Sequence, residues 1–132
     1  MSAQISTGNT NNSGTYSSAI GFQTSAVGDY STAMGYNTTS SASYCTAMGY
    51  ATTASGSTST AMGVNTTASG DGSTSLGNQT IASANNSSAM GASTTASGEV
   101  STAMGYATTA NGSTSTSMGL STTANGEVST AM

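Results

Sequence analysis

The stretch that decides the fold is Gly-Ala-Ser-Thr-Thr-Ala-Ser-Gly-Glu-Val-Ser-Thr-Ala-Met at 91–104. It is followed at 105–118 by Gly-Tyr-Ala-Thr-Thr-Ala-Asn-Gly-Ser-Thr-Ser-Thr-Ser-Met, which keeps both glycines, three threonines and the final methionine in place. Two adjacent segments of equal length with the same residues in the same order indicate an internal repeat. The repeat length of 14 residues is therefore the first property to explain.

The same phase holds through nearly the whole chain. A second glycine column runs from Gly14 to Gly126 and is interrupted only by Ala42 and Ala84. A disordered polar linker has no reason to keep a phase over nine repeats, so the pattern indicates a repeating fold. The first glycine column, which we predict to form structural turns, consists of Gly21, Gly35, Gly49, Gly63, Gly77, Gly91, Gly105 and Gly119. The large apolar residues that precede these glycines are Ile20, Met34, Met48, Met62, Leu76, Met90, Met104 and Met118.

Two short strands and two tight turns fit into 14 residues, whereas helical repeats need more than about 30. We expect Ser-Thr-Ala-Met to form one strand and Thr-Thr-Ala-Ser the other, with a glycine turn after each. Coils stacked about 4.8 Å apart would form a rod on the order of 45 Å long. The sequence thus predicts an all-β protein, a parallel β-roll or β-solenoid over 14–132. Residues 1–13, where only Thr10 is clearly in register, are expected to form a degenerate N-terminal coil or cap.

Alternation along each strand leaves two arrangements open for the Met column. Ser17 and Ala19 share one face of the first strand, and Thr24 and Ala26 share a face of the second. If these small residues fill the interior, the Met column forms an outward apolar stripe that calls for a subunit interface. The reverse arrangement buries the column as core. The residues predicted to be core or interface are Met34, Met48, Met62, Leu76, Met90, Met104 and Met118.

Composition argues against most site chemistry. The chain has no Lys, Arg or His, and its charged fraction is 3%, against about 25% in ordinary domains. Without His or Lys there is no ordinary general base near neutral pH, so we predict no enzyme and no catalytic residues. We also expect no cofactor site and no metal site, since one Cys without His cannot hold zinc. Nucleic acid is excluded as a partner by the lack of cations, and no apolar run suggests membrane insertion.

The remaining unusual residues follow the repeat. The four acids occupy one column and are never in adjacent coils, which suits solvated turn charges better than a calcium site. Cys45 replaces Ser in its column, so we expect a buried or semi-buried thiol rather than a nucleophile. The aromatic residues flank a turn, either packing over it or forming a ligand-facing patch. The acids are Asp29, Asp71, Glu99 and Glu127, and the aromatics are Tyr16, Tyr30, Tyr44, Phe22, Tyr36 and Tyr50.

The repeat resembles the YadA-like heads of trimeric autotransporter adhesins, which carry an Asn-Ser-Val-Ala-Ile-Gly motif every 14 residues. The matching segments are Tyr-Ser-Thr-Ala-Met-Gly at 30–35, Asn-Ser-Ser-Ala-Met-Gly at 86–91 and Val-Ser-Thr-Ala-Met-Gly at 100–105, with Ala-Ser-Gly between them at 54–56, 68–70 and 96–98. Thr and Met stand where the family has Val and Ile. The resemblance covers about residues 14–132 and implies a left-handed β-roll, a homotrimer and display outside the cell.

Three functional hypotheses follow. The first is an adhesive or structural module of an extracellular or cell-surface fibre, which associates with itself and binds a ligand on another cell or on a matrix. The second is a filament built by end-to-end stacking of coils. The third is an ice-binding solenoid that uses the stacked threonine columns Thr24 to Thr122 and Thr32 to Thr130.

Overall fold

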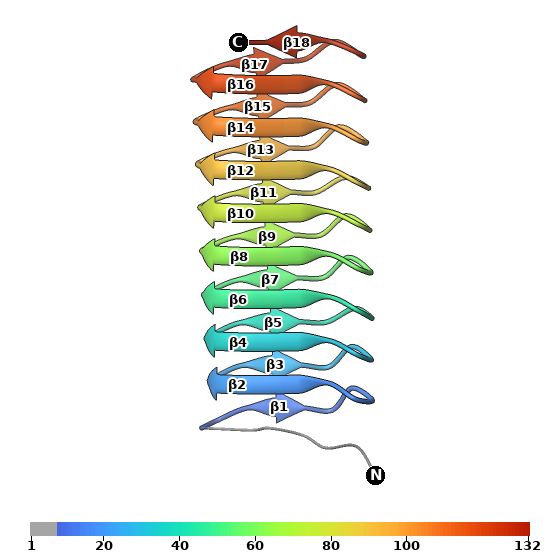
Figure 1. Ribbon diagram of the computed structural model, residues 1–132, viewed down its shortest axis with the longest axis vertical. Helices are drawn as coiled ribbons and strands as arrows, with labels where there is room; N and C mark the ends of the chain where they lie inside the picture. Colours follow the sequence, from blue (N-terminus) through green and yellow to red (C-terminus); the bar gives the residue numbers. More distant parts are fainter. Residues whose placement is uncertain (1–7) are drawn as a thin grey trace.

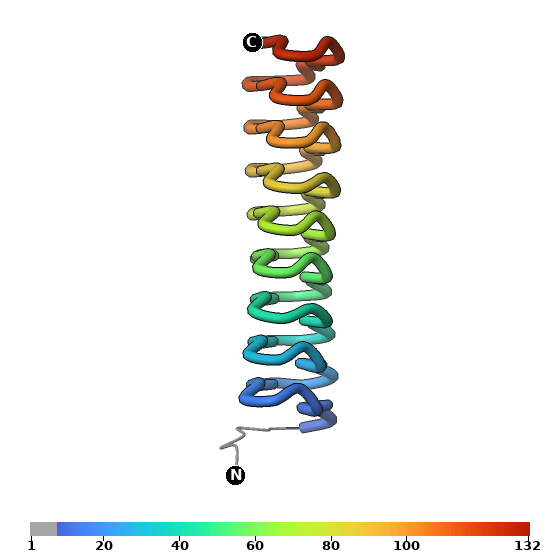
Figure 2. Tube along the Cα trace, turned by 90° about the vertical axis from the view of Figure 1, so that its right-hand side faces the viewer, coloured from blue at the N-terminus to red at the C-terminus, as the bar shows by residue number. Residues whose placement is uncertain are grey.

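The computed structural model describes residues 8–132, which form 18 strands and no helix. The strands alternate between two parallel sheets of nine strands each, and successive coils rise in a straight stack from one terminus to the other (Figure 1). The tube view shows the same coils as a narrow rod (Figure 2). The fold is thus the parallel β-solenoid that the repeat predicts.

One sheet contains two-residue strands and the other contains mostly five-residue strands. The short strands are β1 (Asn11–Asn12), β3 (Ser25–Ala26), β5 (Thr39–Ser40), β7 (Thr53–Ala54), β9 (Thr67–Ala68), β11 (Ile81–Ala82), β13 (Thr95–Ala96), β15 (Thr109–Ala110) and β17 (Thr123–Ala124). The long-strand sheet contains β2 (Ser18–Phe22), β4 (Thr32–Tyr36), β6 (Thr46–Tyr50), β8 (Thr60–Val64), β10 (Thr74–Asn78), β12 (Ser88–Ala92), β14 (Thr102–Tyr106), β16 (Thr116–Leu120) and β18 (Thr130–Ala131).

The N-terminal boundary of the solenoid lies earlier than residue 14. Strand β1 pairs in parallel with β3, with Asn11 opposite Ser25, so residues 11–12 already belong to the stack. The part of the predicted cap that concerns residues 1–7 lies outside the described residues.

Each coil is held to the next by backbone hydrogen bonds in a 14-residue register. Thr102 lies opposite Thr116 in the long-strand sheet, and Thr95 lies opposite Thr109 in the short-strand sheet. The bonds continue through the turns, where the Ala107 N–H donates to the Ala92 carbonyl at 2.9 Å. Because these bonds run along the rod, a sequence with few large apolar side chains can still pair its backbone.

The interior is filled by four columns of small residues, which begin at Ser17, Ala19, Thr24 and Ala26. Nearly all members of these columns are buried, and the interior alanines are 0–3% exposed. The interior arrangement of small residues is therefore confirmed. The alternative that buries the Met column inside the coil is wrong, because these four columns already fill the space between the sheets and Met62 is 39% exposed.

The first glycine column lies inside the long strands rather than in the turns where we predicted it. Gly63 is the fourth residue of β8 and has a φ of 128°. A Cβ at this position would lie 2.0 Å from the carbonyl oxygen of Gly77 in the next coil. These glycines therefore allow successive coils to approach closely, in addition to adopting a conformation that other residues rarely adopt.

The turns place non-glycine residues in the left-handed region twice in most coils. Tyr30 has a φ of 57° and Asn37 a φ of 54°, and the same two columns hold Val100 and Ala107 further along. A β-branched residue such as Val is costly in this region. The second glycine column does begin a turn, as the sequence predicts, since the Ser31 N–H donates to the Gly28 carbonyl at 3.3 Å. The positive φ values of the turns, however, mostly fall on columns with variable residues.

Many interior hydroxyl groups have no hydrogen-bond partner. The Thr66 Oγ1 atom is buried and unpaired, as are its equivalents in most of the described coils. Thr80 differs, because its Oγ1 lies 2.7 Å from the Oγ of Ser75, which replaces the usual interior alanine. Thr66 and Thr80 thus occupy the same interior column, but only the Thr80 hydroxyl has a hydrogen-bond partner.

We predict that Gly63→Ala lowers the free energy of unfolding by about 3 kcal/mol or more, because the new Cβ meets backbone and the φ is unfavourable. Gly119→Ala is the matched control. Its φ is 113°, but the nearest atom to a Cβ is Thr122 Cγ2 at 3.8 Å, so only the conformational cost remains. Urea titration followed by circular dichroism measures both, and equal losses would contradict the close-approach explanation.

We also predict opposite effects for two Thr→Val substitutions. Thr66→Val removes an unpaired buried hydroxyl and should stabilise the fold by about 1 kcal/mol. Thr80→Val leaves the Ser75 hydroxyl buried without its partner and should destabilise it by about 1–3 kcal/mol. Thermal unfolding of the two variants measures both effects. A change in stability of the same sign for both variants would contradict this account of the interior hydroxyls.

Candidate interaction surfaces

The described part of the chain offers its outer faces rather than an enclosed site. No pocket is found in it, and within residues 8–132 no three His, Cys, Asp or Glu side chains gather as metal ligands would. No helix of the described residues is long and apolar enough to cross a membrane. The surface of the described rod consists of the outer faces of its two sheets and the two edges where the chain turns.

The outer face of the long-strand sheet, which we call the Met face, carries a threonine column beside an apolar column. In β8, Thr60 and Met62 point outward, while Ala61 points into the interior. Most side chains of both columns are half-buried even in the isolated chain. The apolar column consists of Ile20, Met34, Met48, Met62, Leu76, Met90, Met104 and Met118, so it forms one continuous stripe along the rod.

The outer face of the short-strand sheet, which we call the Thr–Ser face, carries mainly hydroxyl-bearing residues in both columns. In the coil of β9, Thr67 is half-buried and Ser69 is exposed. From β3 onward, one column consists of Ser25, Thr39, Thr53, Thr67, Ile81, Thr95, Thr109 and Thr123. The other consists of Val27, Ser41, Ser55, Ser69, Ser83, Ser97, Asn111 and Asn125.

The outward threonine column of this face is neither of the two that the sequence predicts as an ice-binding array. The column from Thr24 to Thr122 lines the interior instead, because Thr24, Thr52 and their equivalents as far as Thr108 are 0–1% exposed. The column from Thr32 to Thr130 lies beside the methionines on the Met face. In a Thr-Thr-Ala-Ser segment the first threonine points inward and the second outward. Alternation along the strand could have predicted this face. If the first Thr and the Ala two residues later point inward, the second Thr and the Ser must point outward.

The acidic column lies at one edge of the rod and contributes to the turns. Asp29 Oδ1 accepts the Thr15 N–H at 2.8 Å, and Asp71 Oδ1 accepts the Ser57 N–H at 2.9 Å. All four carboxylates are exposed. Asp29 and Asp71 are therefore more than solvated charges, because each accepts a hydrogen bond from the backbone of the preceding coil.

The aromatic residues of the first coils form two stacked ladders. The Tyr30 ring stacks between those of Tyr16 and Tyr44, with centroid distances of 5.3 and 5.0 Å. Tyr36 stacks in the same way between Phe22 and Tyr50, at 5.6 and 5.2 Å. Since neighbouring rings cover one another's faces, each ladder packs on itself along the coils, although its residues remain 43–60% exposed.

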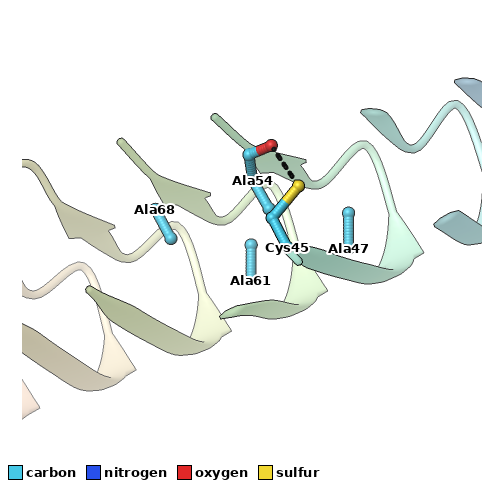
Figure 3. Close-up of a cluster of buried hydrophobic side chains, with 5 residues drawn as sticks. All are labelled: Cys45, Ala47, Ala54, Ala61 and Ala68. Atoms are coloured by element: carbon cyan, nitrogen blue, oxygen red, sulfur yellow. Dashed lines mark hydrogen bonds between the residues drawn. The ribbon is translucent and has the colours of Figure 1, made fainter. Parts of the chain in front are cut away.

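Cys45 lies in the interior, with its thiol directed at neighbouring backbone (Figure 3). Its Sγ lies 2.9 Å from the Ala42 carbonyl oxygen and 3.4 Å from that of Ala54. Ser87 makes the equivalent bond to Ala84 in its own coil at 2.7 Å. The cysteine thus serves as a serine replacement in the core, and its burial does not suit a nucleophile.

The geometry defines a class of protein, a polar parallel β-solenoid with a thin interior. The sequence pattern described as the YadA head domain repeat matches residues 13–38, 40–66, 54–80, 68–94, 82–108 and 96–120, which is well over half of the chain. The chain belongs to this family. A search of curated proteins finds no match to the chain.

We predict that the stacked rings stabilise the first coils. Tyr36→Ala removes two stacked pairs and should lower the free energy of unfolding by about 1–3 kcal/mol. Tyr106→Ala is the control in the same column, because Tyr106 pairs in register with Ala92 and Leu120 and has no ring on either side. Its loss should stay within about 0.5 kcal/mol. Equal losses in chemical denaturation would show that the ladder contributes nothing beyond burial.

Proposed function

We propose that the chain is a head-type module of an extracellular adhesive or structural fibre, that it is not catalytic, and that it associates as a homotrimer. Membership of the YadA head repeat family supports an adhesin-like structural role. The proposal includes the left-handed winding and the cell-surface location that the family resemblance implies. The ligand would be a molecule on another cell or on a matrix.

The observation that carries the proposal is the Met face. Its apolar column extends over eight coils, and long flexible thioether side chains pack readily against a partner surface. A continuous apolar stripe of this length is unusual on a protein that stays monomeric. The interior cannot accommodate these side chains, because alanine, serine and threonine fill it. A second copy of the same rod would bury the column over its whole length.

The lack of basic residues fits an exposed fibre. The chain has no Lys or Arg, and so it offers proteases of trypsin specificity no cleavage site. Its four carboxylates lie at one edge, away from the Met face, so self-association through that face brings no like charges together. Both properties support a role in which the rod itself is the working surface.

The native mass in solution tests the proposal. We expect a trimer by light scattering on a size-exclusion column. Leu76→Glu places a carboxylate in the middle of the Met face and should shift the mass to monomer, because burying an unpaired charge is costly. Ser83→Glu, in the same coil but at an exposed position of the opposite Thr–Ser face, should leave the trimer intact.

Three results would contradict the proposal. A monomeric wild-type chain would remove the self-association on which it rests. A large polydisperse polymer would favour the end-to-end filament instead. A trimer that is equally sensitive to both variants would place the interface elsewhere.

A further inference from the structure

We propose that the Thr–Ser face is an ice-binding surface, which is a function separate from the self-association proposed for the Met face. The proposal commits to one partner, the surface of crystalline water. It rests on the regularity of the threonine column of this face, on its freedom from charge and aromatic rings, and on the availability of its threonine hydroxyl groups; in the neighbouring column, the Ser97 hydroxyl donates to Asn111.

The face repeats in two directions. Along the rod, Thr53, Thr67 and their equivalents lie opposite one another in register, at a spacing of about 4.8 Å. Across the rod, the Thr and Ser columns are two residues apart, which is about 6.8 Å in an extended strand. Neighbouring strands stack with little rotation between them, so the array stays nearly flat (Figure 1). The array is made mostly of threonine and serine, with Val27, Ile81, Asn111 and Asn125 as exceptions, and a flat, nearly regular array suits a partner that is itself a lattice.

The side chains of this face are short and stiff. Threonine has restricted χ1 rotation, so its methyl and hydroxyl groups are already fixed in position before a partner arrives. The Met face lacks this property, because its long thioether side chains are flexible and stand beside the threonines. Threonine columns lie on both the Met face and the Thr–Ser face. Only on the Thr–Ser face do the neighbouring side chains extend nearly the same distance from the sheet.

The threonine hydroxyls are available. Among the described residues, no protein group hydrogen-bonds to the hydroxyls of Thr53, Thr67 or Thr95, although each lies in a regular row. The row can therefore order water molecules between neighbouring hydroxyls, with the repeat of the strands. Ordered water of fixed repeat can join a growing ice surface, and the contribution of each coil adds to that of the next.

Charge and aromatic content favour ice over other flat partners. All four carboxylates lie in the column of Asp29, at the edge of the rod, so the Thr–Ser face is neutral, as ice is. Every aromatic ring lies in the columns of Tyr16 or Phe22, and none lies on this face. A polysaccharide surface would normally be met by aromatic side chains, which present a large apolar area with a polar handle.

The row contains one defect. Ile81 stands where the other coils from Thr39 to Thr123 carry threonine, and its side chain is 42% exposed. It interrupts the hydroxyl row near the middle of the array. If the face binds ice, restoring the hydroxyl at this position should increase the activity of the protein.

The test is thermal hysteresis and ice-crystal shape, measured on the purified 132-residue chain. We expect the wild type to show hysteresis, Thr67→Tyr to lose most of it, and Ile81→Thr to exceed the wild type. Thr114→Tyr is the matched control, because its column already holds tyrosine at 16, 30 and 44, and it should behave as the wild type. Ser69→Tyr, at an exposed position of the same face, replaces Thr67→Tyr should that variant not fold.

Each alternative outcome overturns the proposal. A folded wild type without hysteresis excludes ice binding, and retention on powdered cellulose or chitin without hysteresis assigns the face to a polysaccharide instead. Equal activity of Ser69→Tyr and Thr114→Tyr would place any ice binding on another face. Leu76→Glu separates the two proposals, because it should alter the native mass while hysteresis persists.

Discussion

The close approach of successive coils is the constraint on which the rest of the structure depends. At the glycine column of the long strands, a Cβ would lie 1.9–2.1 Å from the next coil's carbonyl oxygen between Gly21 and Gly105. Only glycine allows this distance, and the distance in turn keeps the 14-residue register of the backbone hydrogen bonds. Because each coil pairs with its neighbours through backbone atoms, most side chains outside the interior and the glycine columns can vary without loss of the fold.

The thin interior explains why the larger side chains lie on the surface. Alanine, serine and threonine fill the space between the sheets, which leaves no room for a ligand cavity or for the methionines. The methionines and the second threonine of each repeat therefore face outward on opposite sides of the rod. One face is apolar and suited to another copy of the chain, and the other is neutral, regular and rich in hydroxyl groups.

Much of this arrangement could be predicted from the sequence, because the period is unbroken. The strands, the parallel register and the inward Ala columns follow from alternation within a 14-residue unit. The turns could not be predicted in the same way. Columns with variable residues, such as Tyr30 and Val100, adopt positive φ, and their identity carries no signal of that conformation. The ladders of Tyr30 and Tyr36 and the Thr15–Asp29 bond also depend on the exact offset between coils, which only coordinates provide.

The most direct test of the account is the distance between spin labels placed on one column in a Cys45→Ser background, with labelled chains diluted in unlabelled ones. Ser41 and Ser97 are four coils apart, and Ser41 and Asn125 are six coils apart. The stack predicts distances of about 19 Å and about 29 Å, since each coil adds about 4.8 Å. Broad distributions centred near about 40 and 50 Å, the values expected of a flexible chain of these lengths, would contradict it.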